Sequence, residues 1–271
     1  MEKIYKRQTV SSEFVIEGLG LHSGVPVQVT VRPGESGIRF RGRGDWIDAV
    51  PANVTDTSRC TRLGEISTIE HLMSAFSGLG ITDADVEVEG GELPAAGGCS
   101  SEYVAAILNA GLADCGEIVV NGPFARVFLQ ELPAKYAVGT GEGWWRAGYL
   151  RDDEFIGRQE FELEYSPERY ATDVAVARTF ALESELEMAK QYGLGKGLDE
   201  SSCLVIGEGR FLNPPRFHDE PARHKLLDLI GDLALSGVPI AHLDVVAEFT
   251  GHRWNVEVAR KLADSVTITR R

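Results

Sequence analysis

The residues best suited to chemistry in this chain are an adjacent pair, Glu70 and His71, and a second pair, His224 and Asp228, that follows much later. Together they offer two imidazoles and one carboxylate to a metal ion. Three such ligands leave a fourth position for water, which is typical of a catalytic rather than a structural zinc site. The carboxylate of Glu70 would then be placed to act as a general base toward that water. The pattern predicts a metal-dependent hydrolase.

Each pair also has an ordinary structural explanation. His224, Asp228 and Asp232 are four residues apart, so on a helix they would form one stripe, and such pairs are frequent on solvated helix surfaces. Residues 67–70 (STIE) have the spacing of a capping box, in which the glutamate would satisfy the first turn of a helix instead of taking part in chemistry. The spacing by itself leaves both explanations open.

Composition and charge narrow the class of protein. The chain has 271 residues and a formal net charge of −14, so it has room for a substantial core and is unsuited to non-specific binding of nucleic acid. The four cysteines include no C-x-x-C pair, which favours a reducing compartment over a disulfide framework. We expect no signal peptide and no membrane span, because no segment has the necessary apolar length. We therefore expect a cytoplasmic monomer, with peripheral membrane contact left open.

The order of hydrophobic patterns predicts strands first and helices later in each half of the chain. Alternating apolar and polar residues predict strands at 27–31, 85–89, 125–129, 158–165 and 173–177. Apolar residues at helical spacing predict helices at 67–79, from 101 onward, and at 183–191, 221–236 and 254–263. This order is typical of an α+β fold in which helices cover one side of each sheet. A change of pattern at 114–123 predicts two domains, 1–116 and 117–271.

Short motifs along the chain resemble, in order, those of the UDP-3-O-acyl-N-acetylglucosamine deacetylase family, the zinc amidases that commit bacteria to lipid A synthesis. They are 18–24 (GLGLHSG), 37–40 (GIRF), 56–61 (DTSRCT), 67–72 (STIEHL), 77–81 (SGLGI), 177–180 (ARTF), 193–197 (GLGKG), 220–232 (EPARHKLLDLIGD) and 251–252 (GH). Because the matches keep the family's order over nearly the whole chain, the resemblance implies the same fold. It also implies hydrolysis of the N-acetyl group of UDP-3-O-acyl-N-acetylglucosamine, a UDP-linked acylated amino sugar.

The resemblance assigns the metal site. His71, His224 and Asp228 stand where the family has its zinc ligands, and Glu70 stands where it has the general base. The implied cofactor is Zn²⁺, and the sequence leaves open whether Fe²⁺ replaces it in the cell. These assignments favour the catalytic explanation of both pairs over the structural one.

Further residues gain roles from the same resemblance. His252 matches the histidine that donates a proton to the leaving amine, and Asp232 matches the carboxylate that orients it. Thr179 matches the hydroxyl that faces the tetrahedral oxyanion. Phe180 resembles the ring that packs on the sugar, and Lys225 resembles a polar group that holds the substrate.

The family fold has two similar α+β domains, each with a mostly antiparallel sheet, and the active site lies between them. Its second domain carries a β-α-β insert that forms a tunnel for the acyl chain. In this chain the insert would lie at about 179–207. Its candidate lining residues are Leu182, Leu186, Met188, Leu194 and Leu198. The resemblance therefore predicts that 1–116 supplies Glu70 and His71, while 117–271 supplies the other ligands and His252.

The chain departs from the family pattern in several places. Gly97 and Cys99 stand where the family has an aspartate and a serine. Arg253 and Trp254 stand where it has small or aliphatic residues, and 117–150 resembles the family poorly. The catalytic set is intact, while the substrate-recognition surface differs. Two alternatives therefore stay open: a related zinc amidase for another N-acyl amino sugar, and a non-catalytic relative that binds a sugar nucleotide or a lipid.

Overall fold

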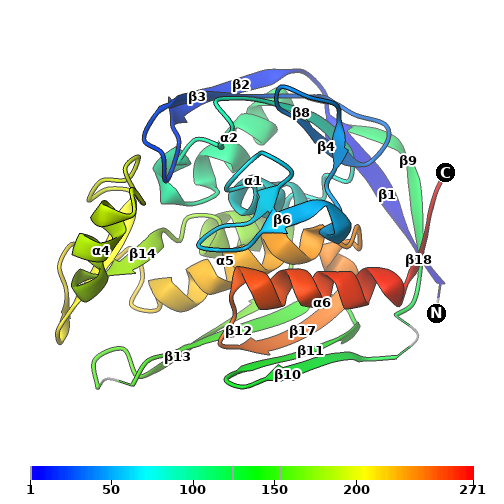
Figure 1. The fold of residues 1–271 in the computed structure, drawn as a ribbon. Coiled ribbons are helices and arrows are strands. Elements are labelled where there is room, and N and C mark those ends of the chain that lie inside the picture. The colour runs from blue at the N-terminus through cyan, green and yellow to red at the C-terminus, as the bar shows by residue number, and fades with distance from the viewer. Residues whose placement is uncertain (1, 124, 153) are drawn as a thin grey trace.

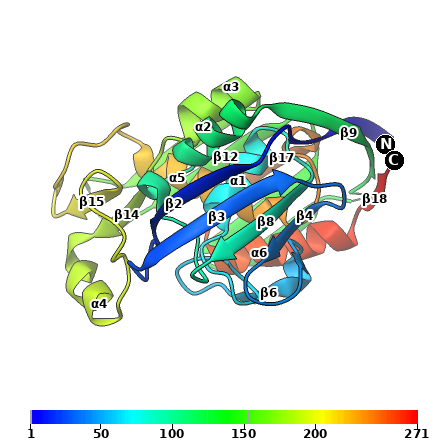
Figure 2. The ribbon, with the colours of Figure 1, turned by 90° about the horizontal axis from the view of Figure 1, so that it is seen from above.

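A computed structural model describes residues 2–123, 125–152 and 154–271. Two five-stranded sheets form the outer layers, and the longer helices lie between them (Figure 1). Seen from above, the first sheet lies in front of the longer helices (Figure 2). A three-stranded sheet closes one end of this sandwich, and a small insert projects from the other end.

The first sheet has the strand order β2-β3-β8-β4-β5. Its strands are β2 (Phe14–Leu19), β3 (Pro26–Pro33), β4 (Ile38–Arg41), β5 (Ile47–Asp48) and β8 (Ala84–Glu89). Neighbouring strands are antiparallel apart from β4 and β8, which run parallel. Alternate residues such as Val29, Val31 and Val86 are fully buried against the helices. The outer face carries ion pairs such as Arg39–Asp85.

The second sheet repeats this arrangement. Its strands are β10 (Val127–Glu131), β11 (Ala134–Thr140), β12 (Trp144–Leu150), β13 (Arg158–Glu164) and β17 (Leu243–Glu248). Their order is β10-β11-β17-β12-β13, and β12 and β17 are the parallel neighbours. In both sheets the strand that comes last in sequence enters between two hairpins, so the two halves share one topology.

The longer helices fill the space between the sheets. They are α1 (Glu70–Gly78), α2 (Ser101–Ala110), α5 (Glu220–Ala234) and α6 (His252–Asp264). In the first half α1 precedes β8 and α2 follows it, and α5 and α6 flank β17 in the same way. α5 packs against α1 on one side and against β12 and β13 on the other. It is therefore buried along nearly its whole length.

The backbones of α1 and α5 are in close contact at Gly231 of α5. A Cβ atom at this position would collide with the backbone carbonyl oxygen of Glu70, at the start of α1. Glycine is required for this contact, because any side chain would push the helices apart. The N-terminal end of α1 is thereby held against the C-terminal part of α5.

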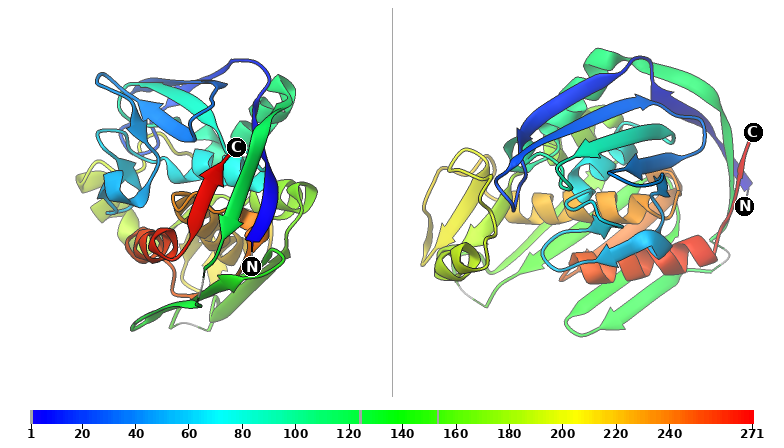
Figure 3. Two further views of the ribbon diagram at one scale, coloured as in Figure 1. Left: turned by 90° about the vertical axis from the view of Figure 1, so that its right-hand side faces the viewer. Right: turned by 45° about the horizontal axis from the view of Figure 1, so that its top comes forward.

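The third sheet consists of β1 (Glu2–Val10), β9 (Leu112–Asn121) and β18 (Thr267–Arg270), with β9 in the centre. Figure 3 shows these strands side by side, next to both chain ends. They join the N-terminal segment, the connection between the two halves and the C-terminal segment. The expected boundary between residues 116 and 117 falls inside β9, and the division at that point stays a prediction.

Among the described residues, an insert distinguishes the second half from the first. It consists of β14 (Thr179–Leu182), the 3-10 turn η4 (Glu183–Glu185), α4 (Leu186–Gln191), β15 (Cys203–Gly207) and β16 (Arg210–Phe211). β14 and β15 run parallel, so the segment is a β-α-β unit. The β-α-β part spans 179–207, in line with the expected range of about 179–207, and β16 extends the insert to Phe211.

Short elements complete the chain. They are η1 (Pro51–Asn53), β6 (Val54–Asp56), β7 (Arg62–Leu63), η2 (Ala96–Gly98), α3 (Pro167–Arg169), η3 (Tyr170–Val174) and η5 (Ile240–His242). In the part of the chain that the structure describes, every helix falls short of the length and apolarity needed to span a bilayer.

The predicted α+β class is confirmed, and a helix lies at each predicted position, with bounds that differ by a few residues. The strand predicted at 173–177 is wrong, because α3 and η3 occupy 167–174. Pro167 and the capping side chain of Ser166 start this helical segment. The apolar pattern instead reflects the buried face of a helical turn around Tyr170.

Candidate active site

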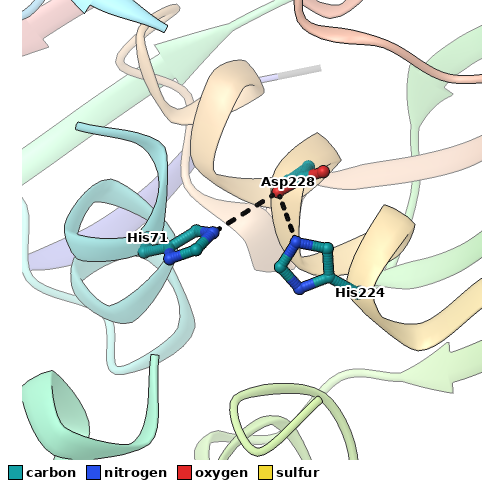
Figure 4. Close-up of side chains that lie close together, drawn as sticks. All are labelled: His71, His224 and Asp228. Carbon is teal, nitrogen blue, oxygen red and sulfur yellow. Dashed lines mark ion pairs between the residues drawn. The ribbon is translucent and has the colours of Figure 1, made fainter. Parts of the chain in front are cut away.

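His71, His224 and Asp228 lie together where α1 meets α5 (Figure 4). One ligand atom from each side chain lies within 4.8 Å of the other two. Oδ1 of Asp228 is 3.3 Å from Nε2 of His224 and 3.8 Å from Nε2 of His71. One turn of α5 separates His224 from Asp228, while His71 enters from the first turn of α1. The fold therefore gathers the three residues predicted as metal ligands, from both halves of the chain.

Burial sets the protonation of these side chains. It lowers the pKa of His71 to about 3, with a further contribution from nearby His224, and it lowers the pKa of His224 as well. Burial alone would raise the pKa of Asp228, but His224 and Lys225 outweigh it and hold that pKa well below its usual range. The imidazole nitrogens of His71 and His224 and the carboxylate of Asp228 are a donor set that a divalent zinc ion accepts.

Hydrogen bonds around the three residues also fit a metal ion. Nδ1–H of His224 donates to the backbone carbonyl of Ala177 over 3.1 Å, which leaves the Nε2 lone pair facing the other ligands. Lys225 donates to Oδ2 of Asp228 over 3.1 Å. Oδ1 of Asp228 is buried and has no hydrogen-bond partner among the described residues. Such an oxygen is costly unless a cation binds it, so the residues fit a bound divalent metal.

Glu70, the first residue of α1, is buried beside these ligands. Its Oε2 accepts a hydrogen bond of 2.9 Å from the backbone N–H of Thr61. The capping-box explanation is wrong, because Ile69 holds the cap position and the backbone N–H of Ser67 makes a different hydrogen bond. Burial raises the pKa of Glu70 to about 8, against the opposing effect of positive charge on His252. A carboxyl group in this range suits proton transfer near neutral pH.

His252, the first residue of α6, faces Glu70 from the second half. Its Nε2 lies 3.9 Å from Oε1 of Glu70, and its Nδ1 lies 3.0 Å from Oδ2 of Asp232. Asp232 is fully buried on α5 and also accepts a hydrogen bond of 2.9 Å from Asn255. Burial alone would lower the pKa of His252, but the carboxylates of Asp232 and Glu70 outweigh it and raise that pKa to about 9. His252 is therefore held protonated near neutral pH.

These groups open onto one cavity of about 810 Å³. Thr179, Phe180 and Lys225 line it too, so every residue predicted for the site reaches the cavity except Asp232, which lies behind His252. The edge of the Phe180 ring packs against Tyr149, with the ring centroids 4.9 Å apart. The five apolar residues expected along the acyl-chain tunnel all line the same cavity. The residues predicted for the site and the apolar residues of the insert thus line one cavity.

Among the departures from the family pattern, the turn at 97–99 and residues 253–254 do not line this cavity, whereas Tyr149, in the segment 117–150, does. Gly97 and Gly98 have φ values of 69° and 68°, and a Cβ at Gly98 would collide with the backbone of Ser202. This turn is therefore shaped for close contact with the insert. Arg253 stacks on Trp254, 4.4 Å from its ring centre, and both line a separate groove between α6 and β10. Neither residue lines the cavity that contains Glu70 and His71.

Sequence reasoning missed two sets of contacts around the site. Thr61 hydrogen bonds to both Glu70 and Asp232. Arg178, next to Thr179, forms a buried ion pair with Glu220 in the first turn of α5, with Nε and Oε1 2.8 Å apart. These residues belong to the motifs at 56–61, 177–180 and 220–232. Their residue types alone indicate no catalytic or binding role. Only their place in these motifs could have marked them as part of the site.

A sequence model of the family described as UDP-3-O-acyl N-acetylglycosamine deacetylase matches residues 7–264. The chain belongs to this deacetylase family. Several proteins named UDP-3-O-acyl-N-acetylglucosamine deacetylase are similar to it over most of their length. The one from Synechocystis sp. is 35% identical over 277 residues, which cover 95% of this chain and 98% of that protein.

Two other named deacetylases give the same result. The protein from Myxococcus xanthus is 36% identical over 276 residues, covering 95% of this chain and 86% of its own. The protein from Aquifex aeolicus is 34% identical over 279 residues, covering 97% and 95%. The similarity to the deacetylase family therefore extends over both halves and the insert.

Proposed function

We propose that this chain is a metal-dependent amidase that hydrolyses the N-acetyl group of UDP-3-O-acyl-N-acetylglucosamine, the step that commits the substrate to lipid A. The observation that carries this proposal is the facing pair of Glu70 and His252 beside three clustered ligand residues, in a cavity with an apolar extension. A binding protein would need the cavity but not a base opposite an oriented acid. The names of the similar proteins support the same activity.

We propose Zn²⁺ as the cofactor, held by His71, His224 and Asp228. When bound, it would lower the pKa of a coordinated water toward ~7 and polarise the substrate carbonyl. The donor set of two imidazoles and a carboxylate supports zinc and also accepts Fe²⁺. Metal analysis of protein purified from its native cells separates the two ions.

The base and the acid divide the proton transfers of amide hydrolysis. Glu70 accepts a proton from the attacking water, whose oxygen forms a new bond to the carbonyl carbon. His252 then donates its proton to the amide nitrogen, and the C–N bond breaks to release the free amine and acetic acid, which ionises to acetate. Asp232 bonds Nδ1 of His252, so Nε2, which lies toward Glu70, is the nitrogen that delivers the proton.

Residues on the cavity wall position the substrate in this proposal. Thr179 donates a hydrogen bond to the oxyanion that develops on the carbonyl oxygen. Phe180 packs on the sugar ring, and Lys225 holds a polar substituent of the substrate. The apolar residues of the insert accept the acyl chain, since leaving water stabilises such a chain in proportion to its buried area. The position of these side chains along one cavity supports the assignment.

We also propose that the enzyme works as a monomer in the cytoplasm. All four cysteines are free thiols, which supports a reducing compartment. The residues of the proposed site come from a single chain, so no second copy is needed to complete it.

The test is acetate release from UDP-3-O-(3-hydroxyacyl)-N-acetylglucosamine by zinc-loaded protein. We expect turnover by the wild-type chain and a loss of turnover after Glu70→Ala. Glu117→Ala is the matched control, because Glu117 is exposed on β9 and outside the cavity, and it should leave turnover unchanged. An inactive wild-type protein that is folded and metal-loaded would contradict the proposal. Equal turnover of acylated amino sugars without the UDP group would favour the related amidase instead.

A further inference from the structure

Thr61 ends the loop that joins β6 to β7, and it is fully buried where the first half meets the second. The loop reaches this point through Arg59, whose φ of 74° is a left-handed conformation that side chains other than glycine rarely adopt. Asp56 supports the turn, since its carboxylate accepts the backbone N–H groups of Thr57 and Ser58. A turn that is strained at Arg59 and stabilised by hydrogen bonds to Asp56 thus places Thr61 beside Glu70 and Asp232.

Three polar atoms of Thr61 bond to the residues around the proposed base and acid. Its backbone N–H donates to Oε2 of Glu70 over 2.9 Å, and its carbonyl accepts from the backbone N–H of Ile69 over 3.2 Å. Its Oγ1 donates to Oδ1 of Asp232 over 2.5 Å and lies 3.4 Å from Nδ1 of His252. One residue of the first half therefore contacts both the proposed base, Glu70, and the carboxylate of Asp232 that orients His252.

We propose that Thr61 is a positioning residue that fixes the Asp232–His252 pair relative to Glu70. The inference rests on the catalytic roles proposed above. Among the described residues, Asp232 accepts hydrogen bonds from the side chains of Thr61, His252 and Asn255. His252 and Asn255 both belong to α6 and move with it. Thr61 is the donor that ties Asp232 to the first half, where the base lies.

The relative position of acid and base depends on this link. Nε2 of His252 and Oε1 of Glu70 are 3.9 Å apart, although different halves of the chain hold them. A displacement of about 1 Å in such an arrangement costs on the order of 100-fold in rate. Loss of the Thr61 hydroxyl would leave Oδ1 of Asp232 without its donor, and the carboxylate would turn and carry His252 with it.

The test is a pair of matched substitutions at Thr61. Thr61→Val keeps the shape of the side chain and the backbone bond to Glu70 but loses the hydroxyl, whereas Thr61→Ser keeps the hydroxyl. For Thr61→Val we expect kcat for acetate release to fall roughly 10- to 100-fold, with KM nearly unchanged. For Thr61→Ser we expect kcat to stay within about 3-fold of wild type, because the bond to Asp232 remains.

A double-mutant cycle with Asp232→Ala distinguishes positioning from a merely structural role. If Thr61 acts through this carboxylate, Thr61→Val should lower kcat of the Asp232→Ala enzyme by no more than about 3-fold, because the group that it positions is already lost. An equal loss in both backgrounds would overturn the inference. A loss confined to KM, or a Thr61→Val enzyme with wild-type kcat, would overturn it as well.

Controls separate failure of this inference from failure of the proposed function. Turnover by wild type that Glu70→Ala removes would support the function, and an unaffected Thr61→Val would then contradict the positioning role alone. An inactive wild-type protein would overturn both. Circular dichroism and metal content establish that each variant is folded and loaded. If Thr61→Val does not fold, Thr61→Ala removes the same hydroxyl without a branched side chain, and the same criteria apply.

Discussion

The two five-stranded sheets have the same strand order and directions, yet the chemistry is divided unequally between the helices beside them. In the first half, the functional side chains sit at the start of α1, where Glu70 and His71 are neighbours. In the second half, His224, Asp228 and Asp232 are spread along α5 at intervals of one turn. A shared topology brings the helices together, and the residues on their facing surfaces decide which half supplies which group.

The helices that follow β8 and β17 show the same division. α6 begins with His252 directly after the short connection 249–251, and it supplies the proposed acid. α2 begins after a longer connection, 90–100, and the hydroxyl of Ser100 donates to the backbone carbonyl of His71 over 2.8 Å. The helix that carries the proposed acid in one half therefore has a counterpart in the other half that begins beside a proposed metal ligand. Equivalent positions keep their contact with the site while their roles differ.

Removing a metal ligand should have the largest effect, whichever half the ligand comes from. We expect His71→Ala and Asp228→Ala to lose the metal and to lower acetate release by more than about 1,000-fold, beyond the 10- to 100-fold typical of residues behind the ligands. Metal analysis and activity assays check this. Chelator-treated wild type should recover when Zn²⁺ is added, and the variants should not. A variant that binds one Zn²⁺ and turns over normally would remove its residue from the ligand set.

Removing the base from the first half or the acid from the second should have the next largest effect. We expect Glu70→Gln and His252→Gln each to lower kcat by roughly 10²- to 10⁴-fold while metal content stays at the wild-type level. The double variant should lose less than the product of the two effects, because the two groups act as a unit. Single-turnover kinetics with metal analysis measure this. Loss of metal in Glu70→Gln would instead make Glu70 a ligand.

Each half also contains a buried arginine–carboxylate pair, Arg7–Asp83 in the first and Arg178–Glu220 in the second. Asp83→Asn and Glu220→Gln should each lower the free energy of unfolding by roughly 3–5 kcal/mol, because each leaves a buried guanidinium without its counter-charge. Urea titration measures this cost.

The two variants should differ in activity. Arg178 also donates to the backbone carbonyl of Pro214 over 2.8 Å and precedes Thr179, so it joins the base of the insert to α5. Glu220→Gln should therefore lower kcat and metal affinity, whereas Asp83→Asn should leave both unchanged at temperatures where it is folded. Equal effects of the two variants on kcat would contradict the expectation that only the Arg178–Glu220 pair supports the site.

The smallest effect is a shift in pH dependence. With its pKa raised to about 9, His252 should lose its proton, and the enzyme its activity, as the pH rises through that value. The same group contributes stability that is fully present below its unfolded pKa of about 6.5 and is lost as the pH rises toward 9. Asp232→Asn removes a charge that raises this pKa, so the alkaline limb of kcat/KM should move to lower pH. A limb that stays in place would assign it to another group.

Residue types and periodicity predicted much of this molecule. Glu70, His71, His224 and Asp228 drew attention because imidazoles and carboxylates at such spacings suit a metal site, and the fold brings them together. The helices that carry them were predicted because apolar residues recur at helical intervals. The β-α-β insert at 179–207 came from the family resemblance, since its own pattern is weak.

Other features depend on contacts that no local pattern records. Thr61 and Asp232 are separated by 171 positions in the chain, and a threonine hydroxyl looks the same whether it faces water or a buried carboxylate. The segment 173–177 read as a strand because its apolar residues face a core that the first half provides, where Tyr170 bonds Ser74. The contacts of Thr61 and the packing of 173–177 exist only after the two halves have met, whereas the missed Arg178–Glu220 pair joins distant positions within the second half.

The contact at Gly231 affects which substitutions in the interior the protein tolerates. At Gly231 the backbone of α5 is in direct contact with the backbone of α1. The distance between His71 and Asp228 is therefore set by this backbone contact rather than by the side chains that pack under either sheet. Larger or smaller side chains between a sheet and the helices would move that sheet and leave the contact between α1 and α5 nearly unchanged. We therefore expect substitutions between the sheets and the helices to change the proposed metal site less than a substitution of Gly231.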